Sequence, residues 1–135
     1  MAVIATAAEI PSDTVRTTAV RKLLYSWNDC VRDCQYLARR TEAHAVCGIP
    51  RGGLVPAALI ARYKRVPLLT LVQARTIQML SGGTVLLLVD DVADSGATFR
   101  ASLIALQQES LGLRFETASL HYKPWSLFVP TYYVH

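Results

Sequence analysis

The stretch Val85-Leu-Leu-Leu-Val-Asp-Asp-Val-Ala-Asp-Ser-Gly-Ala-Thr98 decides the fold of this 135-residue chain. It begins with a continuous apolar run that has the length of a buried strand. Two adjacent carboxylates follow, a third comes three residues later, and the small residues after it begin a helical pattern. A small-residue loop at a helix N-terminus leaves backbone N–H groups free to hold an anion. Carboxylates beside such a loop suit a ligand that carries both hydroxyls and phosphates, as a sugar phosphate does.

Helical and strand patterns alternate around this motif. Helices are expected over residues 27–41, 54–63 and 97–109, and strands over residues 43–49, 66–72, 84–89, 114–120 and 128–134. The first helix begins with a Ser26/Asp29 pair that resembles a capping box. Because helices alternate with strands, we predict one α/β domain over residues 21–135, with a mostly parallel central sheet flanked by helices. Loops that leave its strands for helices would then open at one sheet edge.

The composition narrows the class of protein. The chain is 52% hydrophobic with a mean hydropathy of +0.28, but charges, Gly or Pro interrupt every apolar run, so no membrane span is expected. The net charge is +4, and the basic clusters at residues 32–40 and 62–65 are short. We interpret them as solvated helix faces, and expect no nucleic-acid partner. Residues 1–20 lack the regions of a signal peptide and are expected to form a poorly ordered or loosely docked extension.

The three cysteines, Cys30, Cys34 and Cys47, show neither zinc-ligand spacing nor an even count for pairing. Cys30 and Cys34 lie one helical turn apart and are interpreted as small core residues, and the protein is expected to be reduced and cytoplasmic. The three histidines also show no metal-ligand spacing.

Asp90 and Asp91 follow the apolar run directly, so both carboxylates are expected to be exposed where the sheet ends. One alternative is that they only solvate or cap the next helix. Their mutual repulsion instead favours a cation or polyol partner. Carboxylates accept hydrogen bonds from vicinal ribose hydroxyls and hold Mg²⁺ through water.

The next residues offer phosphate ligands and one unexpected charge. Ser95 and Thr98 supply hydroxyls, and Gly96 allows close backbone approach. Asp94 opposes a phosphate, so it is either the N-cap of the helix or an acid that exchanges a proton with a ligand nitrogen. Residues 48–53 (Gly-Ile-Pro-Arg-Gly-Gly) are either a plain strand-to-helix turn or a second anion site, and they lack the Lys of a nucleotide-triphosphate loop.

Residues 85–98 resemble the phosphoribosyl-pyrophosphate motif of the type I phosphoribosyltransferases. Residues 23–29, 48–62 and 122–125 resemble the xanthine-guanine branch of the 6-oxopurine enzymes, and the resemblance extends over about residues 22–134. It implies a type I phosphoribosyltransferase fold and a Mg²⁺-dependent enzyme of purine salvage. That enzyme would move the phosphoribosyl group from phosphoribosyl pyrophosphate to guanine, xanthine or hypoxanthine, giving the nucleoside monophosphate and pyrophosphate.

The resemblance also assigns the sugar-phosphate half of the site. It implies that Asp90 and Asp91 hold the ribose hydroxyls and associate with Mg²⁺, through water. The 5′-phosphate would be bound by Ser95, Gly96, Ala97 and Thr98.

The remaining roles concern the leaving group and the base. Arg51, Gly52 and Gly53 would bind pyrophosphate, in a loop where the family often has a non-proline cis peptide. Asp94 would be the acid/base that faces purine N7. Lys123 would read the purine 6-oxo group.

Two departures from the family reduce the base half of the site. Only residues 73–83 are available for the long mobile loop that closes over the reacting centre, and they lack its Ser-Tyr pair. The hood that sandwiches the purine is also reduced, and Trp125, Tyr132 and Tyr133 are expected to be core and interface packing residues. We therefore keep three hypotheses: an active homo-oligomeric enzyme, which we favour; a nucleotide-binding module with weak or no turnover and a regulatory or assembly role; and transfer to a smaller base.

Overall fold

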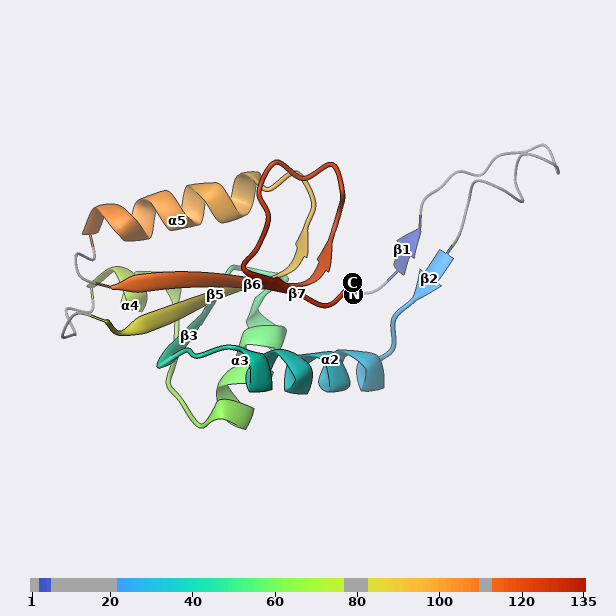
Figure 1. The fold of residues 1–135 in the computed structure, drawn as a ribbon, viewed down its shortest axis with the longest axis horizontal. Helices are drawn as coiled ribbons and strands as arrows, with labels where there is room; N and C mark the ends of the chain where they lie inside the picture. Colours follow the sequence, from blue (N-terminus) through green and yellow to red (C-terminus); the bar gives the residue numbers. More distant parts are fainter. Residues whose placement is uncertain (1–2, 6–21, 77–82, 110–112) are drawn as a thin grey trace, which may run out of the picture.

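The computed structural model describes residues 3–5, 22–76, 83–109 and 113–135, which are built around a five-stranded sheet (Figure 1). In the order in which they lie, its strands are β4 (Leu68–Leu69), β3 (Ala45–Gly48), β5 (Val85–Ala93), β6 (Arg114–Tyr122) and β7 (Tyr132–Tyr133). Every neighbouring pair runs parallel. The predicted α/β class with a mostly parallel central sheet is confirmed.

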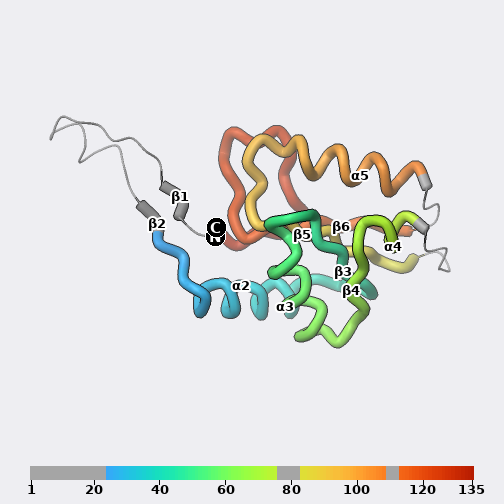
Figure 2. Tube along the Cα trace, turned by 180° about the vertical axis from the view of Figure 1, so that it is seen from behind, coloured from blue at the N-terminus to red at the C-terminus, as the bar shows by residue number. Residues whose placement is uncertain are grey.

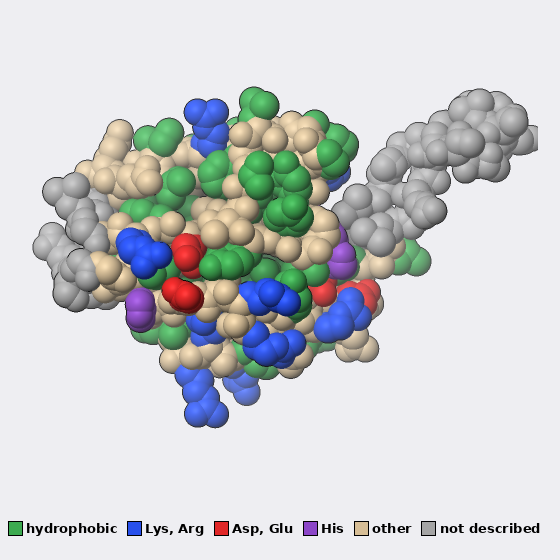
Figure 3. All heavy atoms as spheres, in the orientation of Figure 1, with side chains coloured by type: hydrophobic (Ala, Val, Ile, Leu, Met, Phe, Trp, Pro, Cys, Tyr) green, Lys and Arg blue, Asp and Glu red, His purple; other side chains and the backbone are tan. Residues whose placement is uncertain are grey.

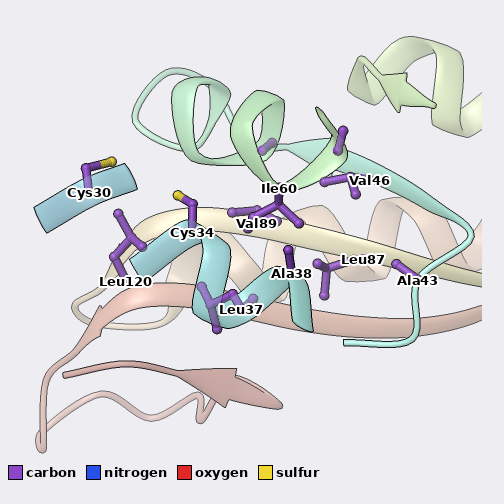
Figure 4. Packing of buried hydrophobic residues seen from close by; sticks show 13 residues of the cluster. Cys30, Cys34, Leu37, Ala38, Ala43, Val46, Ile60, Leu87, Val89 and Leu120 are labelled. Atoms are coloured by element: carbon purple, nitrogen blue, oxygen red, sulfur yellow. The ribbon is translucent and has the colours of Figure 1, made fainter. Parts of the chain in front are cut away.

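Helices cover both faces of this sheet (Figures 1 and 2). Helices α2 (Trp27–Arg40) and α3 (Leu54–Lys64) lie on one face, and α4 (Leu71–Thr76) and α5 (Ala97–Glu109) on the other. The apolar run of β5 serves both layers, since Leu87 and Val89 pack under α2 and α3, while Leu86 and Leu88 pack under α5. A parallel strand that is buried on both faces needs such a continuous apolar sequence. Figure 4 shows the α2/α3 side of the core.

Local sequence signals predicted the bounds of two helices closely. Asp29 N donates to Ser26 Oγ (3.0 Å) and Ser26 N donates to Asp29 Oδ2 (2.9 Å), which is the expected capping box. The helix predicted over residues 27–41 accordingly begins at Trp27. The helix predicted over residues 97–109 has the observed bounds of α5.

The strand predicted over residues 66–72 is present but much shorter than expected. β4 contains only two residues, because α4 begins at Leu71. Thr70 Oγ1 accepts from Gln73 N (3.0 Å) and Thr70 N donates to Gln73 Oε1 (2.9 Å), a second capping box. Part of the expected short lid, residues 73–76, is therefore helical, and residues 77–82 of it lie outside the described residues.

The expected bounds of three strands also change. β5 was expected to stop at Val89 and β6 at Leu120, but their ladder continues to the pair Ala93–Tyr122. β7 is shorter than the expected strand over residues 128–134.

The N-terminal part described is a pair of short strands. β1 (Val3–Ala5) pairs antiparallel with β2 (Lys22–Leu24), an interaction that the sequence patterns did not predict. The rest of the expected extension, residues 1–2 and 6–20, lies outside the described residues. Among the residues described, no helix has the length and apolarity needed to cross a membrane.

Candidate functional site

The connection between β5 and α5 presents the small residues of the motif. Gly96 is buried with φ +90°, and a Cβ there would lie 2.5 Å from the Cβ of Phe128, so the position requires glycine. Ser95 Oγ accepts a hydrogen bond from Ala97 N (3.2 Å). The first turn of α5 is thus capped by Ser95, and the alternative that Asp94 is its N-cap is wrong.

A small hollow of about 60 Å³ lies in this connection. It is lined by Asp90, Val92, Ala93, Asp94, Ser95, Gly96, Thr98 and Phe99. The hollow therefore brings together most of the residues that the sequence suggested for a ribose 5′-phosphate, with Ala97 exposed beside it at the start of α5.

The two adjacent carboxylates face different sides of the sheet. Asp90 points into the small hollow on the α5 side, whereas Asp91 lines a larger pocket on the α2/α3 side. The expectation that both are exposed is wrong for Asp90, whose exposed fraction is 8%. The strand continues past it, so its side chain packs between β5 and α5 rather than beyond the sheet.

Burial changes the acid chemistry of Asp90. Loss of solvation, and then the neighbouring carboxyl group of Asp91, raise the pKa of Asp90 to about 7, although the N–H of Asp91 donates to its Oδ1 (2.8 Å) and opposes the shift. A raised pKa means that the charged form lacks a partner. Donated hydroxyls or a cation would supply one.

The carboxylate pair of Asp90 and Asp91 is also a candidate site for magnesium. The described residues contain no group of three His, Cys, Asp or Glu side chains that could form a protein-only metal site. Mg²⁺ commonly keeps several waters and binds one or two carboxylates together with substrate phosphates. Asp90 and Asp91 fit that sparse donor set.

The loop between β3 and α3 lies directly against β5. A Cβ on Gly52 would lie 2.5 Å from the carboxylate of Asp91, and a Cβ on Gly53 would lie 2.1 Å from Val89 O. The peptide bond between Pro50 and Arg51 is cis, as the resemblance implied. The two glycines therefore allow the backbone of this loop to approach the acidic end of β5, and Gly53 is itself buried.

A pocket of about 390 Å³ opens beside this loop. It is lined by Tyr25, Ser26, Trp27, Cys30, Arg51, Gly52, Val55 and Asp91. Within the described part of the chain, the exposed Arg51 guanidinium has no hydrogen-bond or ion-pair partner, so it is free to bind an anion. The lining residues from α2 and the segment before it were not assigned a role from sequence, although residues 23–29 carried part of the resemblance.

Lys123 and Asp94 are linked through an unexpected residue. Trp125 Nε1 donates to Asp94 Oδ1 (2.9 Å), and Lys123 Nζ lies 5.1 Å from the centroid of the Trp125 ring. Trp125 is 64% exposed, so the core part of its expected packing role is wrong, while interface packing stays a prediction. Lys123 lines neither hollow described above. The Trp125 indole contacts both side chains and so links Lys123 to Asp94.

No protein-family model matches this chain, but it is similar to known proteins. The xanthine-guanine phosphoribosyltransferase of Chromohalobacter salexigens is 38% identical over 92 residues, a match that covers 56% of this chain and 56% of that protein. This chain thus matches about half the length of that curated relative.

Two solved structures match over more of the chain. The purine phosphoribosyltransferase of Pyrococcus horikoshii has a TM-score of 0.67 and 25% identity, with 81% of this chain and 83% of that one covered. The xanthine-guanine-hypoxanthine phosphoribosyltransferase of Helicobacter pylori has a TM-score of 0.68 and 21% identity, with coverages of 82% and 83%.

Proposed function

We propose that this chain transfers the phosphoribosyl group of phosphoribosyl pyrophosphate to a 6-oxopurine. The premise is that the chain is a type I phosphoribosyltransferase by fold. One observation carries the proposal. Asp90 and Asp91 are adjacent on β5 but face two separate hollows, one at a helix N-terminus and one beside a free arginine. A ligand with a phosphate at one end, a diphosphate at the other and hydroxyls between them matches that arrangement.

The donor's charged groups then have defined partners. The 5′-phosphate binds in the small hollow, which Ser95, Gly96 and Thr98 line at the start of α5. The diphosphate binds in the larger pocket, against Arg51 and the loop backbone at Gly52, whereas the N–H of Gly53 already donates to Ile49 O (2.8 Å). Asp90 and Asp91 accept hydrogen bonds from the ribose hydroxyls.

Magnesium, when bound with the donor, would neutralise part of the charge on the leaving diphosphate. Asp90 and Asp91 are the residues that would hold it, through water.

The chain's own residues support charge separation at the anomeric carbon. As the bond to the diphosphate breaks, negative charge grows on the leaving oxygens, and the Arg51 guanidinium stabilises it. Positive charge grows on the ribose, near the two aspartates. Asp94 accepts or returns the N7 proton of the base, and Lys123 donates to the 6-oxo group.

A turnover assay tests this proposal. Protein with Mg²⁺, phosphoribosyl pyrophosphate and guanine, xanthine or hypoxanthine should form the nucleoside monophosphate and release pyrophosphate. Asp94→Asn should lower kcat/KM for the purine by about a hundredfold or more, because the proton acceptor is lost. Its affinity for the donor should fall far less than this, because Ser95, Gly96 and Thr98 remain in the small hollow that Asp94 also lines.

Glu42→Gln is the matched control, since it also removes one exposed carboxylate but lies before β3, at the opposite edge of the sheet. Its turnover should equal that of the unaltered protein. If no purine is consumed while nucleotide still binds, the chain is instead a nucleotide-binding module.

We further propose that residues 21–135 form the catalytic domain and that it works as a homo-oligomer in the cytoplasm. The three cysteines are buried free thiols, which suits a reducing compartment. Exposed apolar side chains at the starts of α2 and α3 (Trp27, Leu54 and Val55) offer a surface for a second copy.

A further inference from the structure

The segment that follows β6 is fixed against the β5–α5 connection. Lys123 N donates to Ala93 O (3.0 Å), and Leu127 N donates to Ser95 O (3.1 Å). Figures 1 and 2 show the two connections side by side. The backbone of residues 123–127 therefore has a defined place beside the proposed phosphate loop.

Trp125 occupies the tip of a tight turn in this segment. Ser126 N donates to Lys123 O (2.9 Å), which closes a four-residue turn with Pro124 and Trp125 at its centre. The turn fixes the backbone, whereas the Trp125 side chain is 64% exposed. The indole can consequently leave its position by rotation about its own side-chain torsions, without rearrangement of the loop.

The hydrogen bond of the indole to Asp94 is one that a purine would need, and the indole also contacts Lys123 through its ring face. Its N–H, on the five-membered ring of a planar two-ring system, donates to Asp94 Oδ1 (2.9 Å). The Lys123 ammonium lies 5.1 Å from the ring centroid, within the range of a cation–π contact. A 6-oxopurine protonated at N7 is also a planar two-ring group with an N–H on its five-membered ring. Asp94 and Lys123 are the two residues that the proposed function assigns to it.

The direction of the N–H distinguishes this arrangement from a stacking platform. An N–H donor of an aromatic ring lies in the ring plane, so the indole plane points its edge at the Asp94 carboxylate. A residue that stacked on the base would present its face to the base and leave Asp94 free. Trp125 instead takes the hydrogen bond of the base itself.

We propose that Trp125 is an internal competitor of the acceptor base, which holds Asp94 until a purine displaces it. The proposal rests on the proposed function and adds a specificity-determining residue to it. The apparent affinity for the base is reduced by the fraction of molecules in which the indole is bound to Asp94. Only bases that engage both Asp94 and Lys123 displace it effectively.

Kinetics of Trp125→Phe test this proposal. Phenylalanine keeps an aromatic ring near Lys123 but lacks the N–H, so KM for the purine should fall about three- to tenfold as Asp94 is released. KM for phosphoribosyl pyrophosphate should be unchanged. Leu127→Ala is the matched control, since Leu127 is an 83% exposed side chain of the same loop, and its KM for the purine should equal that of the unaltered protein. An unchanged or raised KM for the purine in Trp125→Phe overturns the proposal.

Fluorescence provides a readout that does not depend on turnover. The chain has two tryptophans, so Trp27→Phe leaves Trp125 as the only indole. Hypoxanthine added to this variant should shift its emission to longer wavelength as the ring moves into water, while phosphoribosyl pyrophosphate alone should not. A blue shift on saturation with hypoxanthine would show that the ring becomes covered by the base, and overturns the proposal.

If the unaltered protein turns over purines but Trp125→Phe behaves like it, only this inference fails; if neither protein binds or consumes any base, the proposed function fails with it.

Discussion

At the scale of single residues, neighbouring side chains on β5 differ in environment more than their sequence suggests. Asp90 is buried against α5 and Asp91 lines the pocket beside Arg51, although the two are adjacent. The sequence predicted that both acids matter, because two carboxylates after an apolar run need partners. It could not predict that Asp90 is buried, since this depends on how far β5 pairs with β6.

Asp90 should make the stability of the ligand-free protein depend on pH. Its pKa is raised from 3.8 to about 7, so the folded state keeps this proton to a higher pH than the unfolded state does. Folding therefore binds a proton between these pH values, and the free energy of unfolding falls as pH rises through that window. The loss should be complete above the folded-state pKa.

Urea denaturation in EDTA checks this, with Asp90→Asn as the comparison. The free energy of unfolding of the unaltered protein, minus that of the variant, should fall as the pH rises from about 4 to about 7. The pKa of the buried His121 is lowered, so this residue makes stability rise with pH. Its contribution cancels in the difference, because both proteins contain it. A pH-independent difference would show that Asp90 titrates normally.

At the scale of elements, the sequence predicted best those helices and strands whose ends are set by interactions between residues close together in the chain. α2 and α5 were predicted within a residue at each end, because caps and helical periodicity are short-range signals. The strand over residues 66–72 was predicted too long because a capping box at Thr70 was overlooked, although its Thr-x-x-Gln pattern was present in the sequence. The ends of β5 and β6 are set by pairing between distant segments, which no local pattern encodes.

The capping box of α2 should contribute measurably to stability. Ser26→Ala removes the acceptor for Asp29 N, and should lower the free energy of unfolding by about 1 kcal/mol. Ser26→Thr keeps a hydroxyl acceptor and should recover most of that loss. Equal stability of the two variants in urea denaturation would contradict the assignment of the cap.

At the scale of the whole molecule, the sheet divides the proposed site into two halves. Residues of α2, α3 and the loops before them surround the Asp91 pocket, and residues of β5 and the start of α5 surround the Asp90 hollow, so a donor that reaches both must lie across the end of β5. Basic side chains are scattered among uncharged atoms over the face shown in Figure 3, with many on the α2/α3 side. A general attraction of polyanions by these groups is thus the alternative that a binding experiment must exclude.

Binding of phosphoribosyl pyrophosphate, titrated by calorimetry in the presence of Mg²⁺, tests the central claim most directly. The unaltered protein should bind it with one site per chain, and Arg51→Ala should weaken binding about tenfold or more, because a charged partner of the diphosphate is lost. Arg62→Ala removes an exposed arginine of α3 that lines neither hollow, and should bind as the unaltered protein does. No binding by the unaltered protein, or equal weakening by both substitutions, would contradict the account.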